Sequence, residues 1–342
     1  MNRNELYYRK VIGAIGCTML LFLLLLNLFG IGIVFVSTVL SFVFFDAPVI
    51  CDVIYQIFYA VCYLLSFMLP VLLLKKLIGK AGYVYQPMQS PFRMSPWIFL
   101  MIPATITVIF AASYLNASMV NIFGYSEFTS DVLLGTETEK PTAYQWVLEF
   151  IVICVVPGLC EEFLFRGAIQ TNCRPFGSSN AILISSLLFA LMHQNAGQIF
   201  YAFVAGIFLG VVYEKTGSIW NCTILHILNN FASTFEDMIF YKLESVFEST
   251  VYMTLFEILL SVVGLISLAI LIGVFFSKKQ SFRDGVFGKD LPMSDAYAVA
   301  PVSAKRAVGL FLTPSMVIFL VLCLIQILFL ILMAMVYGYV GM

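Results

Sequence analysis

Apolar runs long enough to cross a membrane follow one another through most of this sequence, and they limit the folds that the chain can adopt. A backbone in the hydrocarbon core of a bilayer must satisfy its own polar groups, as a helix does. The chain is 61% hydrophobic and only 11% charged, against roughly a quarter charged for a soluble domain. The sequence therefore predicts an all-α, polytopic transmembrane helical bundle of about eight or nine spans.

The spans are expected to form a central unit between two outer groups of helices. Their approximate bounds are 11–38, 50–74, 96–117, 145–172, 180–195, 198–214, 218–235, 251–276 and 309–337. We expect N-terminal transmembrane helices in 1–144, a central unit in 145–240, and C-terminal transmembrane helices in 241–342 with a cytoplasmic linker at about 277–308. The first apolar run is too long for a cleavable signal peptide and is expected to remain as a span.

The first apolar run, residues 11–45, can hold one long span or two short ones. Two short spans would turn at Asn27, Gly30 and Gly32. Basic residues favour one span, because cytoplasmic loops of membrane proteins carry an excess of Lys and Arg. With one span and a cytoplasmic amino terminus, only two basic residues fall on the outer side, Lys140 and Lys242. The sequence therefore predicts a single long helix here.

Two adjacent carboxylates and an arginine lie inside the apolar run of the fourth expected span. A charge at membrane depth costs roughly 3 kcal/mol on insertion scales, and charges that persist there usually mark function. Glu162 and Arg166 are four residues apart and can pair on one helix face. Glu161 points about 100° away from its neighbour, so it is the freer of the two for chemistry. The alternative is that all three merely hold helices together.

The chain has only two histidines, His193 and His226, and both lie in predicted spans. At 1.5 Å per residue, Glu161 lies about 20 Å from the expected cytoplasmic end of its helix, His193 about 24 Å, His226 about 14 Å and Asn230 about 20 Å. Four polar residues on three helices thus reach a similar depth. This convergence predicts that they share an internal, water-accessible cavity.

A stripe of small residues and a proline also support the prediction of a packed bundle with an internal cavity. Gly206 and Gly210, with Ala202 one turn earlier, form a stripe of small residues that allows another helix to approach closely. Pro157 is expected to kink the fourth span and to free the carbonyl of Ile153. That helix is expected to end at Arg174-Pro175. The eight cysteines are expected to be small buried residues without a metal-binding spacing.

These residue types suit the hydrolysis of a carbonyl compound. A buried carboxylate beside a histidine can take a proton from water, and His226 with Asn230, four residues apart on one helix, can stabilise an oxyanion. Alternatively, Glu161, His193 and His226 can hold zinc with a position open for water. The H-E-x-x-H signature and the G-x-S-x-G elbow are both absent. The residues alone leave the two mechanisms open.

The ordered motifs resemble a known family of intramembrane proteases. They are Glu161-Glu162-x-x-Phe165-Arg166, then Phe189-x-x-x-His193, then His226-x-x-x-Asn230. Over about 145–235 they are similar to the CAAX-protease and bacteriocin-processing family, also called CPBP or Abi, which contains CAAX prenyl protease 2-like enzymes. The resemblance implies that 145–240 is a catalytic core in which Glu161 and His193 activate water. It implies that His226 and Asn230 form the oxyanion site, with Glu162 and Arg166 supporting them.

The same resemblance implies an endopeptidase that cuts a membrane-associated protein or peptide near the cytoplasmic face. It leaves zinc and metal-free glutamate mechanisms both possible. The competing hypotheses are a non-proteolytic membrane protein, such as a bacteriocin immunity or scaffold protein, and a proton-coupled transporter. The expected partners are the lipid bilayer and the substrate, and no nucleic acid, because the sequence has no basic patch with interleaved aromatic residues. A bacterial cell membrane is expected, since the carboxyl end shows no eukaryotic retention signal.

Overall fold

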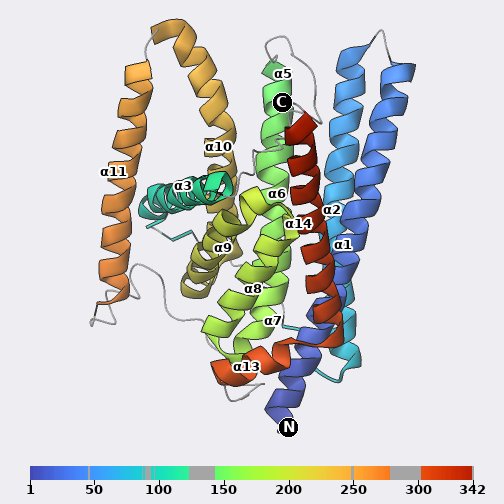
Figure 1. Cartoon of the computed structure of the whole chain (residues 1–342). Helices are drawn as coiled ribbons and strands as arrows, with labels where there is room; N and C mark the ends of the chain where they lie inside the picture. Colours follow the sequence, from blue (N-terminus) through green and yellow to red (C-terminus); the bar gives the residue numbers. More distant parts are fainter. Residues whose placement is uncertain are drawn as a thin grey trace.

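The computed structural model describes residues 1–44, 47–86, 88, 94–95, 97–122, 143–247, 250–277 and 302–340. This part of the chain is helical and contains no strand, which confirms the predicted fold class. The helices outside the centre are α1 (Arg3–Val43), α2 (Pro48–Lys80), α3 (Ile98–Ile122), α11 (Thr250–Phe275), α13 (Ala304–Phe311) and α14 (Pro314–Val340). In Figure 1, α1, α2 and α14 run side by side along one flank, and α11 stands at the other flank.

Within the described residues, four helices are long and apolar enough to cross a membrane: α1, α2 from Val49, α9 and the first part of α14. Shorter apolar helices lie in 98–112, 178–192 and 258–274. The protein is therefore an integral membrane protein. Most of the expected linker at 277–308 and residues 123–142 lie outside the described residues, so the division into three units remains a prediction.

The first apolar run forms one continuous helix, as the basic residues predicted. α1 has 41 residues, a length of about 61 Å, and it passes through Asn27, Gly30 and Gly32 without a turn. Its start is fixed by a capping box, in which Asn2 and Glu5 each bond the other's backbone amide. Glu5 also pairs with Arg306 of α13, with Oε1 and Nε 2.8 Å apart. The amino-terminal turn of α1 and the helix before α14 are therefore held together.

The fourth expected span is a composite helix rather than a regular one. Its consecutive segments are α5 (Ala143–Glu149), the π-helix η1 (Phe150–Val155), α6 (Val156–Glu162), the π-helix η2 (Phe163–Gln170), α7 (Thr171–Cys173) and the 3-10 turn η3 (Arg174–Phe176). The predicted end at Arg174-Pro175 is confirmed, because Gly177 then takes a φ of 118°. The π-helical turns were not predicted. Such turns are rare and occur frequently at functional sites, and here they flank Glu161 and Glu162.

Pro157 explains the first π-helical segment. Proline lacks a backbone N–H, so the ladder of the preceding turn cannot continue as a regular α-helix. The amide of Val156 instead bonds the carbonyl of Ile151. The carbonyl of Ile153 accepts a hydrogen bond from Nδ2 of Asn230 at 3.2 Å. The predicted freeing of this carbonyl is thus confirmed, and a neighbouring helix satisfies it.

The remaining central helices are α8 (Ser178–Met192), α9 (Ala196–Thr216) and α10 (Ile219–Phe247). Glycines allow them to pack closely, as the small-residue stripe predicted. A Cβ atom on Gly206 would lie 3.0 Å from Cα of Ser186, and one on Gly210 would lie 3.1 Å from Oε1 of Gln170. A Cβ atom on Gly158 would lie 2.5 Å from a side-chain carbon of Ile227. α9 is therefore held against α8 and η2, and α10 against α6.

Candidate active site

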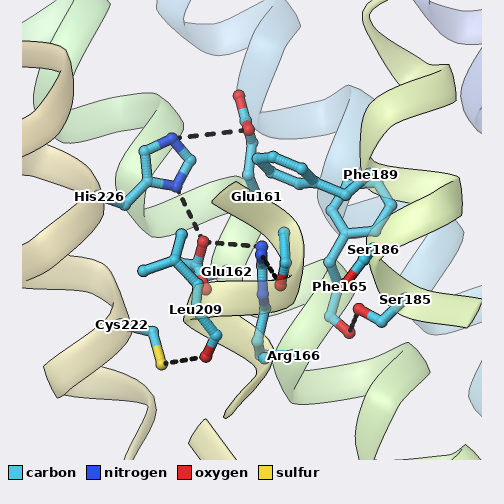
Figure 2. A network of polar contacts seen from close by, with 12 residues as sticks. Glu161, Glu162, Phe165, Arg166, Ser185, Ser186, Phe189, Leu209, Cys222 and His226 are labelled. Carbon is cyan, nitrogen blue, oxygen red and sulfur yellow. Dashed lines mark hydrogen bonds and ion pairs between the residues drawn. The ribbon is translucent and has the colours of Figure 1, made fainter. Parts of the chain in front are cut away.

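The carboxylate of Glu162 is the centre of a buried charge network (Figure 2). Its Oε1 accepts hydrogen bonds from Nη1 of Arg166 at 2.8 Å and from Nδ1 of His226 at 2.8 Å. Glu162 and Arg166 are both fully buried. The ion pair predicted from the i,i+4 spacing is confirmed, and the structure adds the histidine. A buried carboxylate with two such partners is suited to fix the imidazole rather than to react.

Arg166 is held from two further sides. Its Nη2 donates to the carbonyl of Gly206 at 3.2 Å, and its guanidinium lies over the ring of Phe189 at 4.5 Å. Phe165 packs edge-on against the same ring, with centroids 5.3 Å apart. An unpaired arginine at this depth would be very costly. Gly206, which belongs to the small-residue stripe, thus brings its backbone carbonyl within hydrogen-bond distance of the Arg166 guanidinium.

Glu161 lies beside this network but has different partners. It is 4% exposed, and its Oε1 accepts a hydrogen bond from the hydroxyl of Tyr63 on α2. Its Oε2 lies 3.8 Å from Nε2 of His226 and has no hydrogen-bond partner among the described residues. The two nitrogens of one imidazole therefore face the two adjacent glutamates. Oε2 of Glu162 likewise has no hydrogen-bond partner among the described residues, so Glu161 differs from its neighbour in having no bond to Arg166, as expected for the freer member of the pair.

His193 caps α8 and reaches the cluster through an aromatic ring. Its Nδ1 lies 2.9 Å from the carbonyl oxygen of Phe189. Because a carbonyl can only accept, Nδ1 carries the hydrogen, and Nε2 is left with a lone pair in the neutral ring. The Phe189 ring lies 5.3 Å from the His193 ring and 5.8 Å from the His226 ring. The structure thus places both imidazoles against one phenylalanine.

Asn230 lies one turn after His226 on α10, at the level of η1. Its Nδ2 donates to the carbonyl of Ile153 at 3.2 Å, and its Oδ1 accepts from Nδ2 of Asn229 at 3.3 Å. An amide NH₂ has two hydrogens, so one donor is used here to hold the widened turn before Pro157. The structure connects Asn230 to the same composite helix that carries the two glutamates.

The zinc alternative does not fit this arrangement. Within the described ranges, no three His, Cys, Asp or Glu side chains gather as a group that can hold a metal ion. Glu161 and His226 approach each other, but His193 does not complete a group of three with them. All eight cysteines are free thiols, and six of them are buried as expected. The mechanism below therefore uses the protein's own acid, base and hydrogen-bond donors.

Sequence reasoning missed Tyr63. It lies in the second span, 98 residues before Glu161, among many tyrosines and phenylalanines that have no distinctive spacing. Its ring belongs to an aromatic row with Phe67, at 4.8 Å between centroids, and with Tyr59, at 6.0 Å. A tyrosine in an apolar run usually finds a hydrogen-bond partner when it is buried. That rule predicts some partner for each such tyrosine but cannot say which one.

The fold and the site define a class: a helical membrane protein with a buried glutamate and histidine site at membrane depth. The comparison with protein families agrees, because residues 143–232 match the Rce1-like family, described as type II CAAX prenyl endopeptidase Rce1-like. The match confirms, over residues 143–232, the resemblance recognised in the motifs. The matched segment contains all the candidate site residues except Tyr63.

A curated relative supports a wider similarity without naming an activity. The chain is 25% identical over 150 residues to a protein of Mycoplasma capricolum subsp. capricolum that is described as an uncharacterized protein. The aligned part is 39% of this chain and 43% of the relative, so the chain spans less than half of that protein's length. No solved structure matches the chain.

Proposed function

We propose that this protein is an intramembrane endopeptidase that uses Glu161 as the general base for hydrolysis of a peptide bond. The observation that carries the proposal is the different treatment of two adjacent carboxylates. Oε1 of Glu162 is bonded to the cation Arg166 and to His226, whereas Oε1 of Glu161 is bonded to the neutral hydroxyl of Tyr63. Oε2 of each carboxylate has no hydrogen-bond partner in the described structure. One carboxylate orients, and the other can accept a proton.

The attacking water is expected between Glu161 and His193. Oε2 of Glu161 takes a proton from the water, and Nε2 of His193 accepts the second hydrogen as a hydrogen bond, which orients the oxygen. The water oxygen then attacks the scissile carbonyl carbon. The bond formed is carbon to oxygen, and the electron pair of the carbonyl moves to its oxygen.

The resulting oxyanion is expected to accept hydrogen bonds from His226 and Asn230. The two glutamates and Arg166 carry a net charge of −1, so a protonated His226 makes the buried cluster neutral. In this state Nδ1–H donates to Glu162, and Nε2–H is free to donate to the oxyanion. The second N–H of Asn230 is the other donor, one turn further along α10. Such preorganised donors are usually the largest single contribution in acyl-transfer sites.

Collapse of the tetrahedral intermediate breaks the carbon–nitrogen bond. The proton taken up by Glu161 passes to the leaving amine, so that the products are a new carboxyl terminus and a new amino terminus. Glu161 returns to its ionised form and the cycle balances without an oxidant or a metal. Glu162 and Arg166 act as positioning residues, since Glu162 bonds His226 and Arg166 bonds Glu162.

The substrate is proposed to be a membrane-associated protein or peptide cut near the cytoplasmic face. The match to a CAAX-protease family supports this substrate class, and the excess of Lys and Arg on one side supports a cytoplasmic amino terminus. Residues 145–240 are proposed as the catalytic core, with accessory helices in 1–144 and 241–342. The similarity to a Mycoplasma protein supports a bacterial cell membrane.

A comparison of protein termini tests this function. Membranes from host cells that carry the wild-type chain are compared with membranes that carry Glu161→Gln at matched abundance, by mass spectrometry of protein termini. Glutamine keeps the shape of the side chain and an oxygen for Tyr63, but it cannot take a proton. New termini that occur only with the wild type are expected, and they name the substrate. If Glu161→Gln gives the same termini and also rescues a deletion phenotype, the chain acts by binding, as an immunity or scaffold protein would.

A further inference from the structure

A second site that is lined by polar side chains lies at membrane depth, beside the candidate active site. It is a cavity of about 490 Å³ bordered by α1, α14 and the turn between α8 and α9. Amide side chains from all three elements line it: Asn27, Gln194 and Gln326. We call it the amide cavity. Only Gln194 belongs to the segment that matches the protease family, so the family does not account for the cavity.

Gln194 connects the amide cavity to the catalytic residues, because it directly follows His193. Its backbone has a φ of 53°, in the left-handed region that non-glycine residues rarely adopt. Its side chain is 4% exposed, and Nε2 is buried with no hydrogen-bond partner among the described residues. A buried amide donor without an acceptor is unfavourable. A strained backbone combined with an unmet donor points to a group that arrives from outside the chain.

Asn27 and Gln326 form the other side of the amide cavity. Nδ2 of Asn27 bonds the carbonyl of Leu23 in its own helix at 2.8 Å, and its Oδ1 lies 3.4 Å from Nε2 of Gln326. Asn27 is exposed although it sits in the middle of an apolar span. Polar side chains at this depth usually face a partner or a wet cavity. The sequence singled out Asn27 and Gly30 as a possible turn, but α1 continues through both, so they do not serve that purpose.

Gly30 keeps the amide cavity open on the α1 side. It lines the cavity, and nothing lies within 4 Å of the position that a Cβ atom would take. Apart from Asn27, the other α1 residues that line the cavity are apolar: Leu26, Ile31 and Val34. The lining therefore combines neutral amides with aliphatic side chains and contains no charge. It suits a neutral ligand that offers donors, acceptors and apolar groups together.

We infer that the amide cavity binds the main chain of the substrate, in an unwound stretch next to the bond that is cut. This inference rests on the proposed function and adds a subsite to it. A substrate helix must unwind before water can attack, and its freed N–H and C=O groups then have no partners in lipid. Asn and Gln side chains can each donate to and accept from a peptide group. The unmet Nε2 of Gln194 would then find its acceptor in a substrate carbonyl.

The competing explanation is that Asn27 and Gln326 only hold α1 and α14 together. Amide pairs do join transmembrane helices. That role accounts for the 3.4 Å contact between them, but it does not account for the unmet donor of Gln194 or for the open space beside Gly30. The two explanations also predict different effects of mutation. The loss of a contact that only joins α1 and α14 lowers the stability of the protein, whereas the loss of a subsite weakens substrate binding.

A photo-crosslinking experiment tests the inference. The photoreactive amino acid p-benzoylphenylalanine replaces Gly30 in full-length Glu161→Gln protein, and host membranes are irradiated. Gly32 is the matched control, because it is on the same helix, also has nothing within 4 Å of its Cβ position, and points about 200° away. Crosslinks from position 30, and not from 32, are expected to map within a few residues of the new termini that the wild type produces.

The outcomes separate the inference from the proposed function. If the wild type produces termini but position 30 crosslinks only to lipid, or positions 30 and 32 crosslink alike, the amide cavity is not a subsite and the protease assignment stands. If the wild type produces no termini, both fail. A crosslink to a protein that is never cut counts against the inference.

Steady-state kinetics on the substrate identified by its termini give a second test. Asn27→Leu and Gln326→Met are each expected to raise KM roughly three- to tenfold, with kcat within twofold, because each variant loses a hydrogen bond to the main chain of the substrate. Ser41→Ala, which removes an exposed hydroxyl further along α1, where it bonds the carbonyl of Thr38, is expected to change neither. Unchanged KM values together with a lower melting temperature would show that Asn27 and Gln326 only hold α1 and α14 together.

Discussion

The hydroxyl of Tyr63 on α2 donates a hydrogen bond to Oε1 of Glu161 on α6. Tyr63 lies outside the segment that matches the protease family, and Glu161 lies within it. A helix from the amino-terminal part of the chain thus completes the surroundings of the proposed base. The bond fixes one oxygen of the carboxylate and leaves the other toward His226. The accessory helices are therefore expected to contribute to catalysis and not only to membrane insertion.

Tyr63→Phe tests this contribution. A hydrogen bond to a charged group is worth about 1.5–3 kcal/mol, so its loss is expected to lower kcat by roughly ten- to a hundredfold while KM changes little. The ring contact with Phe67 at 4.8 Å is retained, so the protein should still fold. Tyr8→Phe is the control, because Tyr8 is buried more deeply than Tyr63 but packs against Phe176 near the amino-terminal end of α1. Equal kcat values for Tyr63→Phe and wild type would remove Tyr63 from the mechanism.

Glu162→Gln is expected to destabilise the protein much more than Glu161→Gln does. It leaves Arg166, which is fully buried, without its anion, and breaking a buried ion pair costs about 3–5 kcal/mol. Thermal unfolding in detergent measures the difference. The double variant Glu162→Gln/Arg166→Met removes both charges and is expected to recover part of the stability but none of the activity. If Glu162→Gln has the same melting temperature as the wild type, the charge network around Glu162 does not hold the site together.

Gly158→Ala tests whether the packing of α10 on α6 positions His226. The new methyl group would lie 2.5 Å from a side-chain carbon of Ile227 and 3.3 Å from its backbone nitrogen, so α10 must shift at the residue that follows His226. Overpacking of this kind costs about 1–3 kcal/mol, and kcat is expected to fall at least tenfold.

Gly273→Ala is the matched control for that change. Gly273 also lies in a helix, and nothing is within 4 Å of its Cβ position. Alanine is favoured over glycine in helices by about 1 kcal/mol, so this variant is expected to be as stable as the wild type or slightly more stable. Equal melting temperatures and rates for both alanine variants would contradict the close approach at Gly158.

Removal of metal ions is expected to leave the rate unchanged. The described His, Cys, Asp and Glu side chains do not form a three-ligand metal group, and the proposed steps need only protein groups and water. Purified enzyme is assayed before and after exhaustive treatment with EDTA and 1,10-phenanthroline. The prediction is contradicted if the chelators abolish activity and added zinc, but not magnesium, restores it. That result would require a different arrangement of Glu161, His193 and His226.

The cost of charge in a membrane explains which parts of the site were predictable. Glu161, Glu162, Arg166 and the two histidines stand out because each is expensive at that depth, and helix spacing alone predicted the Glu162–Arg166 pair. The single long α1 followed from the positions of the basic residues. The end of the composite helix followed from Arg174-Pro175.

Other parts depend on tertiary packing that sequence patterns do not encode. Tyr63 is one of 17 tyrosines in the chain, and nothing local distinguishes it. The π-helical turn η1 arises because Pro157 and the packing of α10 act together, with Asn230 satisfying Ile153. The contact of His226 with both glutamates needs the precise rotation of α10. The left-handed backbone of Gln194 likewise has no sequence signal, because glycine or asparagine is the usual residue there.

The central claim is that Glu161 activates water for hydrolysis of a peptide bond, and isotope labelling tests it most directly. Purified wild-type protein and Glu161→Gln are each incubated in H₂¹⁸O with the membrane segment that the terminus mapping identifies. Mass spectrometry then measures the new carboxyl terminus. The account predicts one ¹⁸O atom in that carboxylate with the wild type and a rate at least a thousandfold lower with Glu161→Gln, as for loss of a base that acts with other groups. Cleavage by Glu161→Gln at the wild-type rate would contradict it.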